Sequence, residues 1–523
     1  MVRIILLCVL MIGSTMLRAA EATQVVTYPL ASCYQQGEQH TLRVGETEVP
    51  VQAFTPIYDF THFSFSGRQT VTITVNEEIT NYTITPLSLG LKATVDGNKL
   101  SFDIEGSRYL IVKINNLKEL AIAGDNLETE VPDSEGEGIY NILSKPYKAD
   151  KKGKKPSTVA IQTAIDDACR NGGGIVYVPA GLDYCGNLVL RSNVHIYMEG
   201  GAVIRGTGNP KDYITHYRKE SLQMDGTWFI YTDENTSNIK IYGRGTIDGN
   251  GSYMRNQHKY LNNLLMPMQC SGFTVDGITF IDSGLWGVIP TRCDHVLLQN
   301  TKHYNENDKD HEDDSIDIQE CQHVLVRHTI AIAEDDTYST KTWTHTTDIA
   351  DKWYGDPEPL DDVTFDDCLG WSRCATFKLG FGVEQDQTNL RFVNSTSYKS
   401  MRAIAVNHKW GKGIARNVVF DNIDIEGFWP RDKNNSRWLE IYLQAPETVE
   451  DIVIRNVRVR DKGNTPSIIK GYDAKHPLKN IILENIYMYD RNVPAYSLEE
   501  MNITDVNKYI RNLQLIQTYH ANR

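Results

Sequence analysis

The 523-residue sequence lacks several features that mark common classes of protein. Its nine cysteines include no Cys-x-x-Cys pair and no spacing typical of a zinc site. Most of them are expected as small buried side chains, although Cys368 and Cys374 could close a short disulfide loop in an exported protein. Lys and Arg number 53 against 67 Asp and Glu, and this net charge of −14 argues against a nucleic-acid partner, because phosphate binding needs a basic surface.

Long apolar runs are also missing beyond the N-terminus, which argues against a transmembrane helix. The first residues are typical of a secretory signal: Arg3 supplies a positive start, Ile4 to Leu17 an apolar stretch, and Ala20-Glu21-Ala22 a cleavage site. We therefore expect residues 1–22 to be removed and the protein to be secreted, into the periplasm or the medium, without membrane insertion.

A chain of this length is too long for one compact core, and its pattern of apolar and polar residues changes along the sequence. Alternating segments such as Val71-Thr-Ile73-Thr-Val75, and an Asp96-Gly97 turn before Leu100 to Ile104, are typical of antiparallel hairpins. They predict a small antiparallel β-sandwich domain over residues 23–140. The lysine-rich residues 141–156 are predicted to form a solvated linker.

A helix is predicted directly after the linker. Ser157 is a suitable N-cap, and the helix should end at Asn171-Gly-Gly-Gly174. An apolar stripe at helical spacing consists of Ile161, Ala164, Ile165, Ala168 and Cys169. A helix in this position can plug the open end of a solenoid and cover its strand edges.

The remaining sequence repeats one short pattern, an apolar residue at two alternate positions followed by Asn, Asp, His or Gly. Its first members are Ile239, Phe273, Val296, Val324, Val363, Leu390, Val418, Ile452 and Ile481, at steps of 23 to 39 residues. Such steps predict stacked coils, whereas the longer four-stranded blades of a propeller fit them poorly. The repeated Asn tolerates a left-handed turn and can bond to its equivalent one coil away. The predicted fold class is therefore all-β, with a right-handed parallel β-helix over residues 157–523.

Three aspartates carry the predicted chemistry: Asp314, Asp335 and Asp336. Glycosidic hydrolysis needs one carboxyl to protonate the leaving oxygen and another to activate water. The 21 residues from Asp314 to Asp335 make a plausible single coil, and adjacent coils lie about 4.8 Å apart, so these carboxyls can meet on one face. Calcium is the alternative reading of the acidic run from Asp308 to Asp314, but that run lacks EF-hand periodicity, and we expect no metal and no other cofactor.

Residues 157–481 resemble the polygalacturonase family, glycoside hydrolase family 28. The resemblance rests on Gly245 to Gly251, Asp282-Ser-Gly-Leu-Trp286, Glu312-Asp-Asp-Ser-Ile-Asp317 and Glu334-Asp-Asp336 with Lys341 after it. It implies an inverting hydrolase in which Asp335 is the general acid, while Asp314 and Asp336 hold the attacking water. A β-sandwich before a β-helix also resembles the dextranase and isopullulanase family, glycoside hydrolase family 49.

The sequence differs from the family 28 pattern in the motifs with which that family binds its substrate. A Gly-His-Gly motif is expected near Thr376, where no histidine stands, and of an Arg-Ile-Lys motif only Arg402 remains. The expected partner is thus a polysaccharide or oligosaccharide, either a pectic glycan or a dextran-like glucan. The candidate substrate-binding residues are Lys341, Lys378, Arg402, Trp343, His408 and Trp410.

Two other classes of function remain open at this stage. A polysaccharide lyase on the same fold would use a basic residue to abstract the proton beside a uronate, usually with calcium. A non-catalytic glycan-binding solenoid would bind the glycan unchanged. The sequence leaves endo or exo action and the oligomeric state undetermined.

Overall fold

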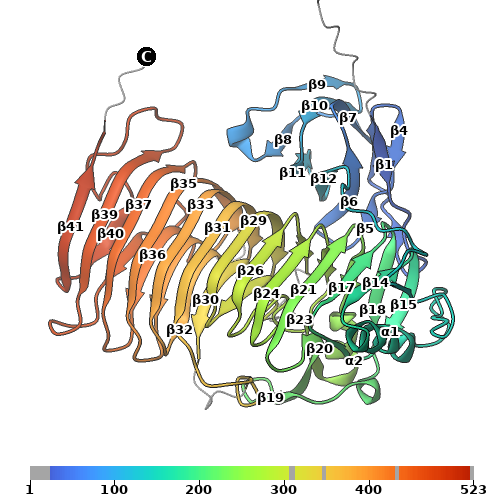
Figure 1. Ribbon diagram of the computed structural model, residues 1–523. Coiled ribbons are helices and arrows are strands. Elements are labelled where there is room, and N and C mark those ends of the chain that lie inside the picture. The colour runs from blue at the N-terminus through green and yellow to red at the C-terminus, as the bar shows by residue number, and fades with distance from the viewer. Residues whose placement is uncertain (1–23, 306–311, 344–348, 430–434, 519–523) are drawn as a thin grey trace, which may run out of the picture.

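The computed structural model describes residues 24–305, 312–343, 349–429 and 435–518, so the predicted signal segment lies outside the described residues. A small β-sandwich stands on the side of a long solenoid of parallel strands (Figure 1). Within the described ranges no helix is long and apolar enough to cross a membrane.

The sandwich consists of two sheets that enclose one apolar core. The seven-stranded sheet contains β1 (Val25–Thr27), β2 (Gln35–Gln36), β5 (Gln52–Ala53), β6 (Tyr58–Phe65), β8 (Tyr82–Thr85), β11 (Arg108–Ile114) and β12 (Glu119–Asn126). The five-stranded sheet contains β3 (His40–Val44), β4 (Thr47–Val49), β7 (Arg68–Val75), β9 (Ala93–Asp96) and β10 (Lys99–Glu105). A short 3₁₀ turn, Leu87–Leu89, follows β8.

Local sequence explains the sandwich strands. On β7, Val71, Ile73 and Val75 are buried while the residues between them are not, as period-2 alternation requires. The predicted hairpin joins β9 to β10, and Gly97 adopts φ 58° at its turn. All pairs are antiparallel except β6 with β12, which run parallel.

The solenoid is a right-handed parallel β-helix, as predicted, and its strands stack into long sheets. One sheet of 18 strands contains β13 (Ile139–Asn141), β14 (Gly174–Val178), β15 (Gly181–Cys185), β17 (Val194–Met198), β18 (Ala202–Gly206), β21 (Thr236–Gly243), β22 (Thr246–Asp248), β24 (Cys270–Asp276), β25 (Thr279–Ile281), β26 (Asp294–Gln299), β27 (Lys302–Tyr304), β29 (Gln322–Ala333), β31 (Leu360–Ser372), β33 (Gln387–Ser400), β35 (Ala415–Phe428), β37 (Val449–Val459), β39 (Leu478–Met488) and β41 (Ile510–Ile516).

A second face of the solenoid, here called the groove sheet, holds the site described below. Its strands are β16 (Leu188–Leu190), β20 (Met224–Thr232), β23 (Tyr260–Met266), β28 (Ile316–Gln319), β30 (Tyr338–Thr342), β32 (Ala375–Val383), β34 (Arg402–His408), β36 (Arg437–Leu443), β38 (Ser467–Lys470) and β40 (Ile503–Val506). Bridges at Val288 connect β23 to β28, so the face is continuous. The short strand β19 (Tyr217–Lys219) pairs antiparallel with β20, and a 3₁₀ turn, Pro210–Asp212, lies just before it.

The predicted repeat is confirmed in register. Every first member of the pattern pairs with the next one: Ile239↔Phe273, Phe273↔Val296, Val296↔Val324, Val324↔Val363, Val363↔Leu390, Leu390↔Val418, Val418↔Ile452 and Ile452↔Ile481. A slip of one residue would turn every apolar side chain outward, so the buried face fixes this register.

The repeated Asn has both properties expected of it. Asn394, Asn422, Asn456 and Asn485 all adopt φ between 51° and 56°, in the left-handed region. Asn422 donates to the Oδ1 of Asn394 at 2.9 Å, and Asn485 donates to Asn456 at 3.2 Å. The turns of neighbouring coils are therefore stacked through side-chain amides.

Helix α1 (Thr158–Arg170) covers the N-terminal end of the solenoid, and its predicted apolar stripe packs into the solenoid core. A second helix, α2 (Gly251–His258), follows β22. The predicted boundary between sandwich and linker at residues 140–141 differs from the structure, because β13 already pairs with β14, and Ile142 of the predicted linker is fully buried. The edge of β14 needs hydrogen-bond partners, and residues 139–141 supply them, so the chain joins the solenoid before α1.

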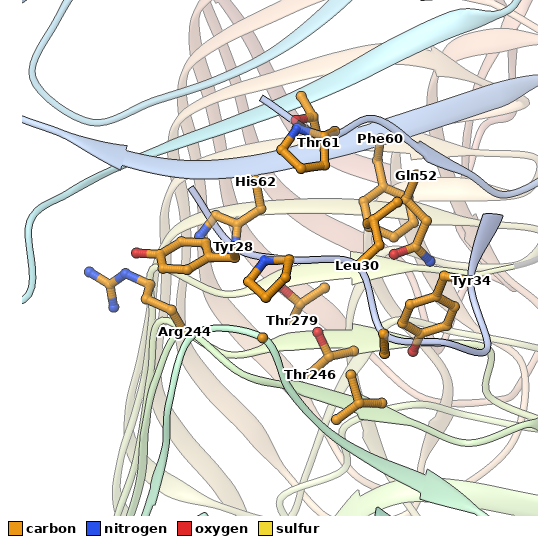
Figure 2. A pocket seen from close by; sticks show the side chains of 15 residues that line it. Tyr28, Leu30, Tyr34, Gln52, Phe60, Thr61, His62, Arg244, Thr246 and Thr279 are labelled. Carbon is orange, nitrogen blue, oxygen red and sulfur yellow. Dashed lines mark hydrogen bonds between the residues drawn. The ribbon is translucent and has the colours of Figure 1, made fainter. Parts of the chain in front are cut away.

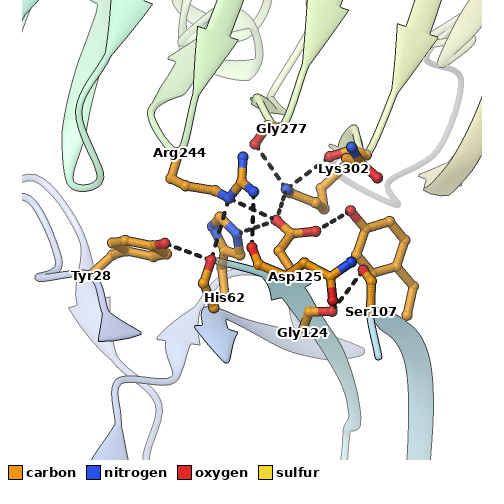
Figure 3. A network of polar contacts seen from close by, with 12 residues as sticks. Tyr28, His62, Ser107, Gly124, Asp125, Arg244, Gly277 and Lys302 are labelled. Carbon is orange, nitrogen blue, oxygen red and sulfur yellow. Dashed lines mark hydrogen bonds and ion pairs between the residues drawn. The ribbon is translucent and has the colours of Figure 1, made fainter. Parts of the chain in front are cut away.

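The sandwich packs against the solenoid through an apolar cluster, a polar network around Asp125 and further polar contacts, such as Lys399 with Glu119 at 2.8 Å. The cluster joins Tyr58, Phe60, Tyr109, Ile111, Ala121 and Ala123 of the sandwich to Ile281, Tyr304, Ile330, Ile332, Leu369, Trp371 and Tyr398 of the solenoid. In the network, the buried Asp125 accepts from Lys302 Nζ at 2.7 Å, from His62 at 2.8 Å and from the Tyr109 hydroxyl at 2.6 Å (Figure 3).

A small cavity of about 50 Å³ lies beside this network, between residues 28–34 and the first coils (Figure 2). At its edge a Cβ on Gly201 would stand 2.9 Å from Pro29, and Gly201 adopts φ 88°, so only glycine lets the two segments approach. The cavity is a gap in the packing between sandwich and solenoid, and is too small for a sugar.

Candidate active site

The three predicted aspartates lie together in one pocket on the groove sheet. The pocket encloses about 660 Å³. Its lining consists of Lys219, Ser221, Trp286, Glu312, Asp314, Asp335, Asp336, Lys341, Trp343, Ile349, Cys374, Lys378, Phe381, Glu384 and Trp410. Four of the six predicted binding residues, Lys341, Lys378, Trp343 and Trp410, are therefore in the pocket with the acids.

Asp335 and Asp336 stand at the tight turn that leads into β30. Asp313, one coil earlier, is fully buried and shapes this turn by accepting the backbone N–H of Glu334 at 2.7 Å and of Asp335 at 3.0 Å. On the other side, Ser372 donates to the carbonyl of Asp335 at 2.6 Å. Bonds from two neighbouring coils thus fix where both carboxyls point.

The two adjacent carboxyls have opposite electrostatic environments. Burial raises the pKa of Asp335 to about 6, and the charge of Asp336 adds to this rise against the opposing effect of Lys378. Burial also acts to raise the pKa of Asp336, but Lys378 and Lys341 outweigh it and leave that pKa below its usual value. Lys378 lies 2.5 Å from Asp336 Oδ2. Asp335 is thus poised to carry a proton while Asp336 stays ionised.

Asp314 faces this pair from the preceding coil. Burial raises its pKa well above the usual range, with a further contribution from the charge of Asp317, while Lys341 opposes the rise. Lys341 contacts Asp314 and donates to Asp317 at 2.8 Å, and its ammonium lies 4.2 Å from the ring centroid of Trp286. Both pocket lysines are thus ion-paired to aspartates, and they also present positive charge to the pocket.

Aromatic rings surround the acids. Trp286 and Trp343 are stacked with centroids 6.3 Å apart, and Trp410, which is 44% exposed, lies 5.8 Å from Trp343. Phe381 covers Lys378 at 4.0 Å. Ring faces of this kind suit the apolar faces of sugar rings.

The structure does not bring two predicted binding residues into the pocket. His408 is fully buried and its Nε2 contacts the carbonyl of Gly413 at 2.8 Å, because its position on β34 points inward. Arg402 does not line the pocket, and its guanidinium lies 2.8 Å from Glu440. His408 is therefore no longer proposed as a substrate-binding residue, and the guanidinium of Arg402 is occupied by its ion pair with Glu440.

Cys374 is the main pocket residue that the sequence alone did not reveal. Its sulfur and the carboxylate oxygens of Asp335 and Asp336 all lie within 4.8 Å of one another. Cys374 precedes β32 just as Asp335 and Asp336 precede β30, so its place relative to the strand was the available signal. All eight cysteines of the described residues are free, so Cys368 and Cys374 form no disulfide.

The acidic residues considered as calcium ligands either contact other groups of the protein or lie outside the described residues. Asp308 and Asp310 fall in the undescribed range 306–311. Asp313 accepts backbone N–H groups, Asp314 contacts Lys341, and Glu312 lies 3.2 Å from Lys219.

Comparisons with known proteins show which proteins this chain is similar to. The family model described as Glycosyl hydrolases family 28 matches residues 176–355, a range that includes Asp314, Asp335 and Asp336. The resemblance predicted from the sequence is therefore confirmed, and the chain is similar to the polygalacturonase-type glycoside hydrolases.

One relative by sequence and two solved structures illustrate this similarity. An exo-poly-alpha-D-galacturonosidase of Dickeya chrysanthemi is 38% identical over 122 residues, which are 22% of this chain and 20% of that protein, so the match spans only a fifth of the relative's length. The family 28 exopolygalacturonase of Yersinia enterocolitica has the same fold, with a TM-score of 0.58 and 15% identity over 86% of this chain and 97% of that one. Dex49A of Penicillium minioluteum also shares the fold, with a TM-score of 0.59 and 11% identity over 92% and 94% of the two chains.

Proposed function

We propose that this protein is a secreted, inverting glycoside hydrolase that removes sugars from the end of a pectic, galacturonate-containing chain. The observation that carries the proposal is the pair of adjacent carboxyls with opposite shifts, a raised pKa at Asp335 and a lowered one at Asp336, inside a pocket large enough for a sugar. Such a separation of pKa values is what divides acid from base among neighbouring carboxyls.

The proposed mechanism assigns each aspartate a role. Asp335 donates its proton to the glycosidic oxygen as the bond from that oxygen to the anomeric carbon breaks. Water attacks the opposite face of the anomeric carbon, and the ionised Asp336 accepts the proton that the water loses. Asp314, held by Lys341, orients the water, and the single displacement inverts the anomeric centre.

An ion pair at one end of the pocket supports exo action. Lys219, the last residue of β19, and Ser221, just beyond it, line the side of the pocket that faces the N-terminal coils. The ion pair of Lys219 with Glu312 at 3.2 Å connects this segment to the catalytic coil. A contact across this end of the pocket favours the end of a chain over the middle of a polymer.

A uronate substrate is supported by charge and by relatives. Lys341 and Lys378 bring two cations to the pocket floor, where a sugar carboxylate can approach them. The Dickeya relative is named for poly-galacturonate, and the Yersinia structure is an exopolygalacturonase. We further propose residues 1–22 as the secretion signal, a sandwich domain that ends near residue 138, and a β-helix domain that begins at β13.

The test is reducing-sugar release from homogalacturonan, rhamnogalacturonan, dextran and pullulan by the wild type and by Asp335→Asn. We expect monosaccharide release from homogalacturonan, and a rate about 10²- to 10⁴-fold lower in Asp335→Asn, the usual contribution of a general acid. Proton NMR of the first product should show the inverted anomer. Arg391→Gln, an exposed change on the opposite sheet, serves as the control and should match the wild type.

Three results would contradict the proposal in different ways. An unsaturated, ultraviolet-absorbing product that disappears with chelator would indicate a lyase. Release from dextran alone would reject the pectic substrate but keep the hydrolase. Equal rates in the wild type and Asp335→Asn would reject the assigned general acid.

A further inference from the structure

A second depression continues from the candidate active site along the groove sheet. It is lined by Lys409, Trp410, Tyr442, Leu443, Gln444, Lys470, Gly471, Tyr472 and Asn507. These residues lie at or just beyond the ends of β34, β36, β38 and β40, four consecutive strands of the groove sheet. Trp410 lines both depressions, so they adjoin each other.

The chemistry of this second depression suits an acidic sugar chain. Trp410 and Tyr472 are 44% and 41% exposed, although large aromatic side chains are usually covered. Lys409 is exposed and has no carboxylate partner among the described residues; its ammonium lies 4.6 Å from the Trp410 ring centroid and 5.0 Å from that of Phe381. Lys470, by contrast, is paired to Asp505 at 2.7 Å. Lys409 is thus the cation here that is free to meet a uronate.

The geometry also fits the direction in which a substrate must extend. The ion pair of Lys219 with Glu312 lies on the side of the N-terminal coils, while the second depression lies on the side of the C-terminal coils. Adjacent strands lie about 4.8 Å apart, so the three steps from β34 to β40 span about 14 Å, enough for more than one sugar ring.

We infer that Lys409, Trp410 and Tyr472 form an extended subsite that holds the polymer side of an acidic glycan whose terminal sugar occupies the catalytic pocket. The inference rests on the proposed exo-hydrolase function and adds to it the binding of the leaving chain. Lys409 binds a uronate carboxylate, while the rings of Trp410 and Tyr472 pack against sugar faces. This placement takes over the carboxylate contact that Arg402 cannot make, because Arg402 is paired with Glu440.

The test compares hexagalacturonate with digalacturonate as substrates for Lys409→Gln and Tyr472→Ala. Both residues lie outside the lining of the catalytic pocket, so we expect the ratio of kcat/KM for the hexamer to that for the dimer to fall about two- to tenfold in each variant, the usual worth of one aromatic or charged contact. Matched controls are Lys462→Gln and Tyr489→Ala, exposed residues of the same types that do not line the depression, and their ratios should equal that of the wild type.

A binding measurement separates failure of this inference from failure of the proposed function. Hexagalacturonate is titrated calorimetrically into Asp335→Asn with and without Lys409→Gln and Tyr472→Ala, which requires no turnover. Weaker binding in the combined variants supports the subsite. Unchanged binding and an unchanged ratio overturn it, even if the wild type is active. Absence of turnover in the wild type, with binding that depends on Lys409 and Tyr472, overturns the hydrolase alone.

Discussion

At the scale of single residues, the pocket assigns different tasks to chemically identical groups. Asp313 accepts backbone N–H groups, Asp314 contacts a lysine, Asp335 is driven toward its protonated form and Asp336 toward its ionised form. None of these differences comes from the residue type. They come from burial and from the group beside each carboxyl, which is a backbone N–H at Asp313, a lysine at Asp314 and Asp336, and a second carboxylate at Asp335.

The opposite shifts predict a pH profile. Because Asp335 must be protonated and its pKa is raised to about 6, kcat/KM should be retained below pH 6 and fall as the pH rises through that value. Asp336 must be ionised, and its lowered pKa keeps it so into acid. Cys374 acts to lower the pKa of Asp335, so Cys374→Ala should move the falling limb to higher pH, while Cys374→Ser keeps a donor and should shift it less. A limb that stays in place in both variants would show that another group controls it.

At the scale of structural elements, the coil turn combines two effects in one residue. Asn422 adopts φ 56° and donates its amide to Asn394 at 2.9 Å. Asn422→Gly keeps the backbone conformation and loses the bond, which should cost about 0.5 to 1.5 kcal/mol of unfolding free energy. Asn422→Ala also adds left-handed strain and should cost about 1 kcal/mol more. Thermal denaturation of both variants measures the difference, and equal stability of the two would mean that backbone strain at this turn is negligible.

The same element shows how far the sequence predicts the structure. The coil register could be predicted because it depends on local information, two alternating apolar residues and a turn-forming Asn, repeated along the chain. The pairing of Lys341 with Asp314 and of Lys378 with Asp336 could not, because coil lengths vary from 23 to 39 residues and decide which side chains become neighbours. Likewise, the pairing of residues 139–141, which were assigned to the end of the sandwich and the start of the linker, could not be predicted, because their partner, β14, lies more than thirty residues away.

At the scale of the whole molecule, the contact between sandwich and solenoid depends on a pair that no local pattern reveals. Asp125 and Lys302 are 177 residues apart, both almost fully buried, and 2.7 Å from each other. Lys302 also donates to the carbonyls of Gly277 at 2.8 Å and Asn300 at 2.9 Å, both on the solenoid (Figure 3). The lysine therefore serves as a connection between the solenoid backbone and the sandwich.

Removing that connection should loosen the sandwich without altering the distant pocket. Lys302→Met removes one of the positive charges beside the buried Asp125. Loss of one partner of a buried ion pair typically costs about 3 to 5 kcal/mol of unfolding free energy. We expect a lower melting temperature and faster proteolysis in residues 127–138, the irregular segment between β12 and β13, with kcat/KM for digalacturonate unchanged at a temperature where the variant stays folded. The control is Arg68→Gln, which breaks an exposed pair with Asp103 and should change neither property. Because the two parts also share an apolar cluster and other polar contacts, such as Lys399 with Glu119, a variant with wild-type melting and proteolysis would show that Lys302 is not needed to hold them together.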